Sequence, residues 1–347
     1  LSAQDAWSPL ESMKIKSISQ TEISNDGKSI AYVVREPIME GKKSEYLSQI
    51  WVTDIESKEN IQYTFNQKSS SSPKFSPDGK KIAFLSSRSG KNQIWIMNTL
   101  GGEARMLTKE KKGVRSIKWS PDGKMISFLK SDDDTEEEIK SKENKTDVIL
   151  VDKNFKYSHI YSYNLEEDTV TQVTSGNYSV NSFDYSPNGE KIIFSHQEDT
   201  NINTGFVNTD ISVIDSDGNN LKILIARPGR DGNPIFSRDG NKFAFISSGG
   251  KQESIGLRDV YIYDLKNQKT IKLSDTPNRD SNIISWSSDN KMVIISENVN
   301  TTSQVIMLPV NGNKYISWSY NKYKEGVISS VVKSKESDYI ALCYENL

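Results

Sequence analysis

The stretch PKFSPDGKKIAFLSSRSGKNQIWIMNTLGGEARMLT, from Pro73 to Thr108, decides the fold of this chain. It contains four short segments rich in β-branched and aromatic residues, separated by the turn signals SPDG, SRSGKN and LGGE. Segments of this kind, bounded by Gly, Pro, Asn and Asp, are typical of strands joined by tight turns. The stretch therefore predicts four antiparallel strands, with no arrangement of acid, base and nucleophile among them.

The core of this stretch recurs along the chain. Six copies are recognisable: ISNDGKSIAYV, FSPDGKKIAFL, WSPDGKMISFL, YSPNGEKIIFS, FSRDGNKFAFI and WSSDNKMVIIS. Their first serines are Ser24, Ser76, Ser120, Ser186, Ser237 and Ser287, which lie 44 to 66 residues apart. Four-stranded units repeated at such a period are typical of β-propellers. We expect an all-β fold: a β-propeller of four-stranded antiparallel blades, six complete blades plus a partial seventh.

The aligned copies also predict where each blade begins and which residues are equivalent. The blades are expected to begin near Ile23, Pro73, Arg115, Val180, Asn233 and Ile283. The aromatic residues Trp51, Trp95, Tyr161 and Tyr261 are expected at equivalent places in the third strands. The chain then divides into a lead-in at 1–22 and a propeller domain at 23–347, with a charged insertion at about 130–146.

The turn that follows each repeat serine has residues suited to its backbone geometry. Proline fixes φ at the first central position, Asp or Asn suits the second, and Gly takes the left-handed conformation that closes the turn. The predicted turn residues are Asp26, Gly27, Pro77, Asp78, Gly79, Pro121, Asp122, Gly123, Asn188, Gly189, Asp239 and Gly240. Because this geometry accounts for one acid per turn, we interpret these carboxylates as structural rather than catalytic.

Composition excludes several classes of protein. The 347 residues are 35% hydrophobic and 26% charged with a net charge of -2, which is typical of a soluble globular protein and gives no excess of basic residues for nucleic acid. No apolar run is long enough to span a bilayer. The single cysteine, Cys343, excludes an internal disulfide and a cysteine-based zinc site, and nothing indicates a cofactor or another metal.

Two features near the ends of the chain predict its cellular location and its continuation. The start LSAQDAWSP resembles the segment that remains after a signal peptide has been cleaved. We therefore expect a periplasmic or secreted protein, with a cytoplasmic protein as the alternative. Near the other end, EGVISSVVKSKESDYIALCYE has the pattern of the first two strands of a seventh blade. Half a blade would expose an unpaired strand edge. We therefore expect the natural protein to continue past Leu347.

The quoted repeats, continuing into GVRSIKWSPDGKMISFL, resemble the N-terminal propeller of prolyl-oligopeptidase-type serine peptidases, in their acylaminoacyl-peptidase branch. TolB-like periplasmic propellers share the same S-P-D-G repeat, and they remain the alternative. The long loop between Leu129 and Lys156 favours the peptidase propeller, because TolB-like repeats are more even. A TolB-like propeller would act as a free-standing protein-binding module.

The peptidase resemblance implies a C-terminal α/β-hydrolase domain that carries the catalytic serine on a G-x-S-x-G turn. This chain contains no G-x-S-x-G, and its two histidines, His159 and His196, fall at strand ends. The resemblance therefore implies a non-catalytic propeller that covers the active site and filters peptide substrates. We expect no catalytic residue in this chain.

The insertion KSDDDTEEEIKSKENKTD is the one candidate for substrate contact. Residues 131–145 hold seven acids, and TEEEIKSKEN is compatible with a short helix. Some dipeptidyl-peptidase relatives bind the free amino terminus of a substrate with paired glutamates from a propeller insertion. That resemblance makes Glu136, Glu137 and Glu138 candidate substrate-binding residues. The alternative is a solvated charged loop.

Overall fold

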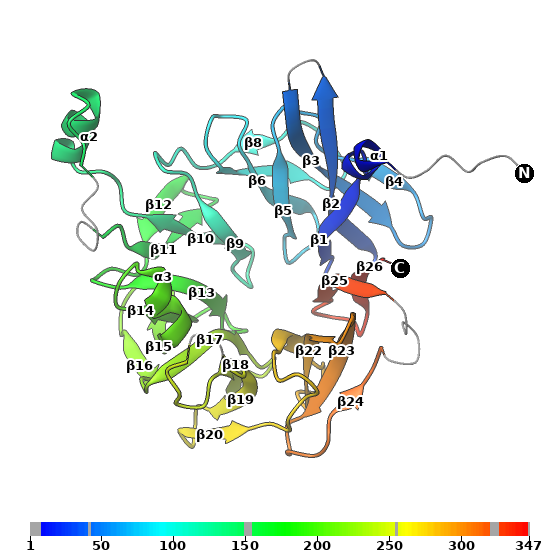
Figure 1. Ribbon diagram of the computed structural model, residues 1–347, viewed down its shortest axis with the longest axis vertical. Helices are drawn as coiled ribbons and strands as arrows, with labels where there is room; N and C mark the ends of the chain where they lie inside the picture. Colours follow the sequence, from blue (N-terminus) through cyan, green and yellow to red (C-terminus); the bar gives the residue numbers. More distant parts are fainter. Residues whose placement is uncertain (1–7, 41–42, 149–154, 254–255, 320–325, 346–347) are drawn as a thin grey trace, which may run out of the picture. The chain divides into compact units, whose positions relative to one another are not determined.

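The computed structural model describes residues 8–40, 43–148, 155–253, 256–319 and 326–345. Contacts divide the chain into two compact parts, a first part of Leu1–Met106 with Ser329–Tyr344 and a second part of Leu107–Ile328 with Glu345–Leu347. In both parts the described residues form four-stranded antiparallel sheets, in which the strands follow one another in sequence order (Figure 1). The all-β propeller prediction is confirmed, whereas the number of blades in the ring stays a prediction.

The first part holds two of these sheets and most of a hairpin. Sheet I consists of β1 (Ser17–Ile23), β2 (Ser29–Glu40), β3 (Lys43–Asp54) and β4 (Asn60–Gln62). Sheet II consists of β5 (Ser70–Phe75), β6 (Lys81–Ser86), β7 (Gln93–Asn98) and β8 (Arg105–Met106). The hairpin consists of β25 (Val327–Lys333) and β26 (Ile340–Glu345).

The second part holds four sheets. Sheet III consists of β9 (Arg115–Trp119), β10 (Met125–Ser131), β11 (Ser158–Asn164) and β12 (Thr169–Gln172). Sheet IV consists of β13 (Ser179–Tyr185), β14 (Lys191–Gln197), β15 (Asn208–Asp215) and β16 (Lys222–Ile225). Sheet V consists of β17 (Gly229–Phe236), β18 (Lys242–Ser247), β19 (Asp259–Asp264) and β20 (Lys269–Lys272). Sheet VI consists of β21 (Asn282–Trp286), β22 (Met292–Val299), β23 (Thr302–Pro309) and β24 (Ile316–Ser317).

The turn between the first two strands of each sheet is built by its serine. Ser76 Oγ donates to Asp78 Oδ1 at 2.6 Å and accepts the N–H of Lys81 at 2.9 Å. The carbonyl of Ser76 accepts the N–H of Gly79, whose φ is +69°. The hydrogen bond from Ser76 also lowers the pKa of Asp78. The same serine contacts recur in the turns that begin at Ser24, Ser120, Ser186, Ser237 and Ser287.

The first strand of each sheet contains a β-bulge or similar irregularity that could not be predicted from its sequence. The register between first and second strands shifts in all six sheets. In sheets I, II, III and V a non-glycine residue four positions before the repeat serine has a positive φ; these residues are Gln20, Ser72, Ser116 and Asn233. A bulge of this kind bends a strand and increases its twist.

Neighbouring sheets share their hydrophobic cores. Each of four clusters of buried side chains draws on two consecutive sheets, and the clusters join sheets I and II, III and IV, IV and V, and V and VI. Sheets IV and V are also linked where β15 and β17 pair in parallel over two residues. Side chains that alternate along each strand therefore pack between sheets, as face-to-face sheet packing requires.

The predicted equivalence of the third-strand aromatic residues is confirmed by the strand register. Trp51 lies opposite Tyr32, and Trp95 lies opposite Phe84. In the same way, Tyr161 lies opposite Phe128 and Tyr261 lies opposite Phe245.

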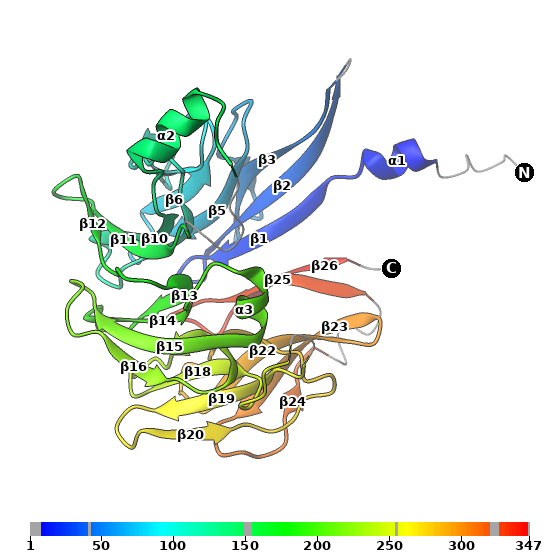
Figure 2. The same ribbon diagram turned by 60° about the vertical axis from the view of Figure 1, so that its left-hand side comes forward.

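The hairpin of β25 and β26 repeats the first half of a sheet, as the sequence predicts. Ser334 takes the place of the repeat serine, because its N–H donates to the carbonyl of Tyr339 at 3.0 Å, as that of Ser24 does to Ser29. Ser334 Oγ also donates to the carbonyl of Asn25 at 2.6 Å. The C-terminal hairpin is thereby attached to sheet I within the first part of the molecule (Figure 2).

Three features differ from the sequence prediction. The first strand begins at Ser17, inside the segment expected as a lead-in, because the bulge at Gln20 interrupts its alternation. Helix α1 (Pro9–Met13) precedes it, capped by Ser8 with proline at the first helical position. Helix α3 (Ile202–Val207) interrupts the connection from β14 to β15. Both helices are too short to produce a visible helical period.

Candidate functional site

The charged insertion lies between β10 and β11 of sheet III and contains helix α2 (Glu136–Glu143). Figure 1 shows this helix set off from the sheet that carries it. A capping box begins the helix, because Thr135 Oγ1 accepts the N–H of Glu138 at 3.2 Å and Glu138 Oε2 accepts the N–H of Thr135 at 2.7 Å. The short helix with which the sequence is compatible is therefore present, in place of the irregular loop that was its alternative.

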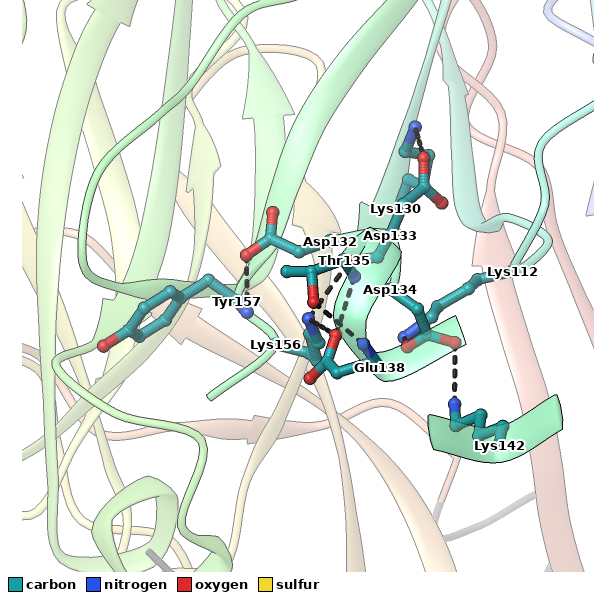
Figure 3. A network of polar contacts seen from close by, with 10 residues as sticks. All are labelled: Lys112, Lys130, Asp132, Asp133, Asp134, Thr135, Glu138, Lys142, Lys156 and Tyr157. Atoms are coloured by element: carbon teal, nitrogen blue, oxygen red, sulfur yellow. Dashed lines mark hydrogen bonds and ion pairs between the residues drawn. The ribbon is translucent and has the colours of Figure 1, made fainter. Parts of the chain in front are cut away.

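Glu138 is already engaged by the protein itself. Besides closing the capping box, its Oε2 accepts a hydrogen bond from Lys156 Nζ at 2.6 Å (Figure 3). The Lys156 ammonium and the Thr135 N–H together hold the pKa of Glu138 below its ordinary value. Glu138 therefore stabilises the insertion, and a substrate amine would have to compete with Lys156 for it.

Asp134 forms a second anchor of the insertion. Its two carboxylate oxygens contact Lys112 Nζ at 2.6 Å and Lys142 Nζ at 2.7 Å, so that it links the loop before β9 to α2 (Figure 3). The two ammonium groups lower the pKa of Asp134 to about 2. Asp132 contributes a further contact by accepting the N–H of Tyr157 at 3.0 Å.

Lys130 lies at the base of the insertion, at the end of β10. Its Nζ donates to Glu110 Oε2 at 2.7 Å and lies 4.7 Å from the centre of the Tyr161 ring. Asp133 Oδ2 is a more distant partner, at 3.5 Å. Lys112, Lys130 and Lys156 were not identified from the sequence, although a run of seven acids with three internal lysines is a signal that lysines elsewhere in the chain could contact it.

Glu136 and Glu137 differ from Glu138 in that their side chains are exposed in the first turn of α2. No hydrogen bond or ion pair to another described residue holds either carboxylate. Acidic residues stabilise this end of a helix through the helix dipole, which accounts for their presence without a substrate. Their role in binding a substrate amine stays a prediction.

The two histidines lie near one another but do not form a catalytic arrangement. The rings of His159 and His196 each pack on Tyr178, with centroids 5.4 Å and 5.0 Å apart. His196 Nε2 contacts Ser212 Oγ at 2.8 Å, and burial lowers the pKa of His196 to about 4. Ser212 is 1% exposed in the middle of β15, so no substrate could reach its hydroxyl.

Two other kinds of site were sought in the described part of the chain. None of the helices there is long and apolar enough to cross a bilayer. In the same residues, no group of three or more His, Cys, Asp or Glu side chains could hold a metal ion.

Comparison with known proteins connects this fold to peptidases. Residues 38–152 match the family described as TolB beta propeller domain. Over 76 residues, 22% of this chain and 11% of the relative, the chain is 34% identical to the uncharacterized peptidase YuxL of Bacillus subtilis. Over 138 residues, 37% of this chain and 19% of the relative, it is 23% identical to the probable dipeptidyl-peptidase 5 of Aspergillus clavatus. Over these segments the chain is thus similar in sequence to a TolB-type propeller and to two peptidases.

Solved structures show the same fold. The acylaminoacyl peptidase of Pyrococcus horikoshii superposes with a TM-score of 0.72 at 18% identity, covering 98% of this chain and 50% of that one. TolB from Acinetobacter baumannii gives a TM-score of 0.50 at 19% identity, covering 84% of this chain and 66% of that one. The chain thus spans about half the length of the peptidase structure and a smaller share of the two sequence relatives.

Proposed function

We propose that this chain is the non-catalytic propeller of a prolyl-oligopeptidase-family serine peptidase, which covers the active site of a C-terminal hydrolase domain and filters peptide substrates. The observation that carries the proposal is that both sequence relatives are named as peptidases. The match to the acylaminoacyl peptidase supports it, because nearly all of this chain corresponds to half of that protein. A periplasmic or secreted location stays a prediction of the sequence.

The chemistry of the chain agrees with a filter. His196 is bound to a buried serine, and His159 Nδ1 contacts Thr174 Oγ1 at 3.3 Å, so neither histidine is placed to activate a nucleophile toward a substrate. Rigid sheets with shared cores can instead limit what passes to a neighbouring cavity, since close-packed interiors resist deformation. Under this proposal the catalytic serine belongs to the hydrolase domain.

A TolB-like binding module is the second candidate, and the family match over residues 38–152 favours it. It belongs to a different functional class, because such a propeller presents a surface to partner proteins without an attached enzyme. The two candidates differ in whether the natural gene product hydrolyses peptides at all.

The filter is tested by loosening the contact between sheet I and the C-terminal hairpin. Thr21 N donates to Ser330 Oγ at 2.5 Å, and Ser334 Oγ donates to the Asn25 carbonyl. A Ser330→Ala, Ser334→Ala double variant of the natural gene product removes both bonds. We expect kcat/KM for a long peptide to rise relative to that for a short chromogenic peptide. Tyr32→Phe, which removes the exposed hydrogen bond to Asn60 in the same sheet, is the matched control.

An unchanged ratio of the two kcat/KM values in the double variant, with short-peptide cleavage intact, would contradict filtering and leave the peptidase assignment standing. No peptide cleavage by the natural gene product would favour the binding module instead.

A further inference from the structure

Strands β2 and β3 are longer than their neighbours and form an arm beyond the rest of sheet I. Each has 12 residues, and they pair without interruption from Ser29↔Asp54 to Glu40↔Lys43. The neighbouring strands stop earlier, because β1 reaches no further than Arg35 and β4 pairs only with Trp51–Thr53. We define the arm as residues 35–39 and 44–48. Figure 1 shows β2 and β3 projecting together past β1.

One edge of the arm is closed by proline. The N–H and carbonyl groups of successive residues in a strand point alternately to its two sides. In β2, the groups of Val33 and Arg35 point toward β1 and pair with it. Pro37 is the next residue in that series, and it has no N–H to offer. Proline at such a position protects an edge from pairing with another strand.

The other edge of the arm, along β3, is open. Ile50 directs its backbone groups away from β2, since its N–H donates to Thr64 Oγ1 and its carbonyl accepts from Tyr63 N. Ser48 N also points that way and donates to Ser69 Oγ at 3.1 Å. By alternation Tyr46 and Ser44 follow in the series, and no described residue bonds their outward N–H and carbonyl groups. An open edge of this kind is a template for another strand.

The arm also exposes apolar side chains on one face. Tyr46 lies directly opposite Pro37, and Met39 lies diagonal to Tyr46 on the same face. Tyr46 is 49% exposed and Met39 is 42% exposed. The Arg35 guanidinium covers one side of the Tyr46 ring at 3.6 Å from its centre. A two-stranded hairpin with an exposed apolar face is at best marginally stable in water.

We propose that the β3 edge of this arm pairs antiparallel with the same edge of a second copy of the chain. A two-fold axis makes such an edge complementary to itself, because each outward N–H of one copy meets an outward carbonyl of the other. The pairing turns two marginal hairpins into one four-stranded sheet. It also brings Met39 and Tyr46 of both copies onto one continuous face.

The charges of the arm permit this approach. Arg35, Glu36 and Glu45 lie on the arm, and Lys16 Nζ pairs with Glu36 Oε2 at 3.1 Å, so these four charges sum to zero. Two copies therefore meet without net repulsion. A second copy is favoured over an extended peptide, because the open edge is short and the second copy adds apolar contact that a short peptide backbone lacks.

The test compares Ser44→Pro with Ser44→Ala in the full chain by sedimentation equilibrium over a dilution series. Proline removes the outward N–H of residue 44 without removing a bond inside the arm, whereas alanine keeps that N–H. The two-fold axis means that each dimer loses two hydrogen bonds, one from residue 44 of each copy. We therefore expect Ser44→Pro to raise the dimer dissociation constant about 30-fold relative to Ser44→Ala. Thermal unfolding of both variants checks that the arm change leaves the fold intact.

Tyr46→Lys provides a second variant. It places two lysines close to the two-fold axis, where they repel each other, so this variant should also be monomeric. A wild-type chain that stays monomeric throughout the series would overturn the proposal, as would a Ser44→Pro dimer as tight as that of Ser44→Ala. A monomer that instead binds extended peptides through the same edge would overturn it as well. The readout is mass, so this test is independent of any peptidase activity.

Discussion

Lys118 Nζ lies 2.7 Å from Asp184 Oδ1 and joins the first strands of sheets III and IV. The second oxygen, Asp184 Oδ2, accepts the N–H of Phe236 at the end of the first strand of sheet V. One carboxylate therefore links three consecutive sheets of the second part. In the first part, Lys74 and Glu22 form the corresponding contact between sheets I and II, with the charges reversed.

This geometry predicts unequal effects for the two partners of the ion pair. Asp184→Ala leaves the Phe236 N–H without its acceptor and should lower the free energy of unfolding by about 1–3 kcal/mol. Lys118→Ala breaks a partly exposed ion pair and a distant contact with the Phe183 ring, and should cost less than about 1 kcal/mol. Urea denaturation of both variants measures the difference. Equal losses would show that the Phe236 contact contributes nothing.

The repeat turn makes a second prediction, at Gly79. Its φ is +69°, and a Cβ added there would meet nothing within 4 Å, so a substitution is opposed by backbone strain alone. Gly79→Ala should therefore destabilise the fold by about 1 kcal/mol. Gly79→Asn should cost less, because asparagine tolerates the left-handed region. Equal thermal stability of the wild type and the alanine variant would contradict this account of the turn.

A structural feature can be predicted from the sequence when residues close to it in the chain determine it, and not when tertiary packing does. The turn from Ser76 to Gly79 is determined by residues within a few positions, so its pattern is visible in the sequence. The bulges at Gln20 and Ser116 place ordinary residues at positive φ, which tertiary packing imposes and the residue type does not show. At Gln20 the consequence was that β1 was predicted to begin too late, near Ile23 instead of Ser17.

The same distinction holds for the candidate site. The capping box of Thr135 and Glu138 is local, and the short helix could be predicted from it. The anchoring lysines Lys112 and Lys156 are distant in sequence and reach the insertion because strands β9 to β11 bring them there. Sequence reasoning therefore located the charged helix but not the contacts that already occupy Glu138.

His196 gives the fold a pH dependence. Burial lowers its pKa from 6.5 to about 4, so the unfolded chain binds a proton in this interval while the folded chain does not. The contribution of His196 is fully present above pH 6.5 and is lost as the pH falls toward 4, by an amount on the order of 1–3 kcal/mol. His196→Gln should flatten the dependence of unfolding free energy on pH between these values. An unchanged slope would contradict this.

The amine-binding interpretation of α2 predicts a change in kinetics. In an intact peptidase, Glu136→Gln with Glu137→Gln should raise KM for peptides with a free amino terminus but not for N-blocked peptides. Glu143→Gln, at the other end of the same helix, is the control. Glu138 is left unchanged, because its loss would also disturb the helix cap. Unchanged KM values would assign the insertion to a solvated surface.

The central proposal is that this chain belongs to a serine peptidase whose nucleophile lies outside residues 1–347. Treatment with a fluorophosphonate, which forms a bond to an activated serine oxygen with loss of fluoride, tests it most directly. We predict that the chain Leu1–Leu347 remains unlabelled, while the natural gene product is labelled at one serine of a G-x-S-x-G turn located after Leu347. Stoichiometric labelling of a serine within Leu1–Leu347, or a natural gene product that takes no label, would contradict the account.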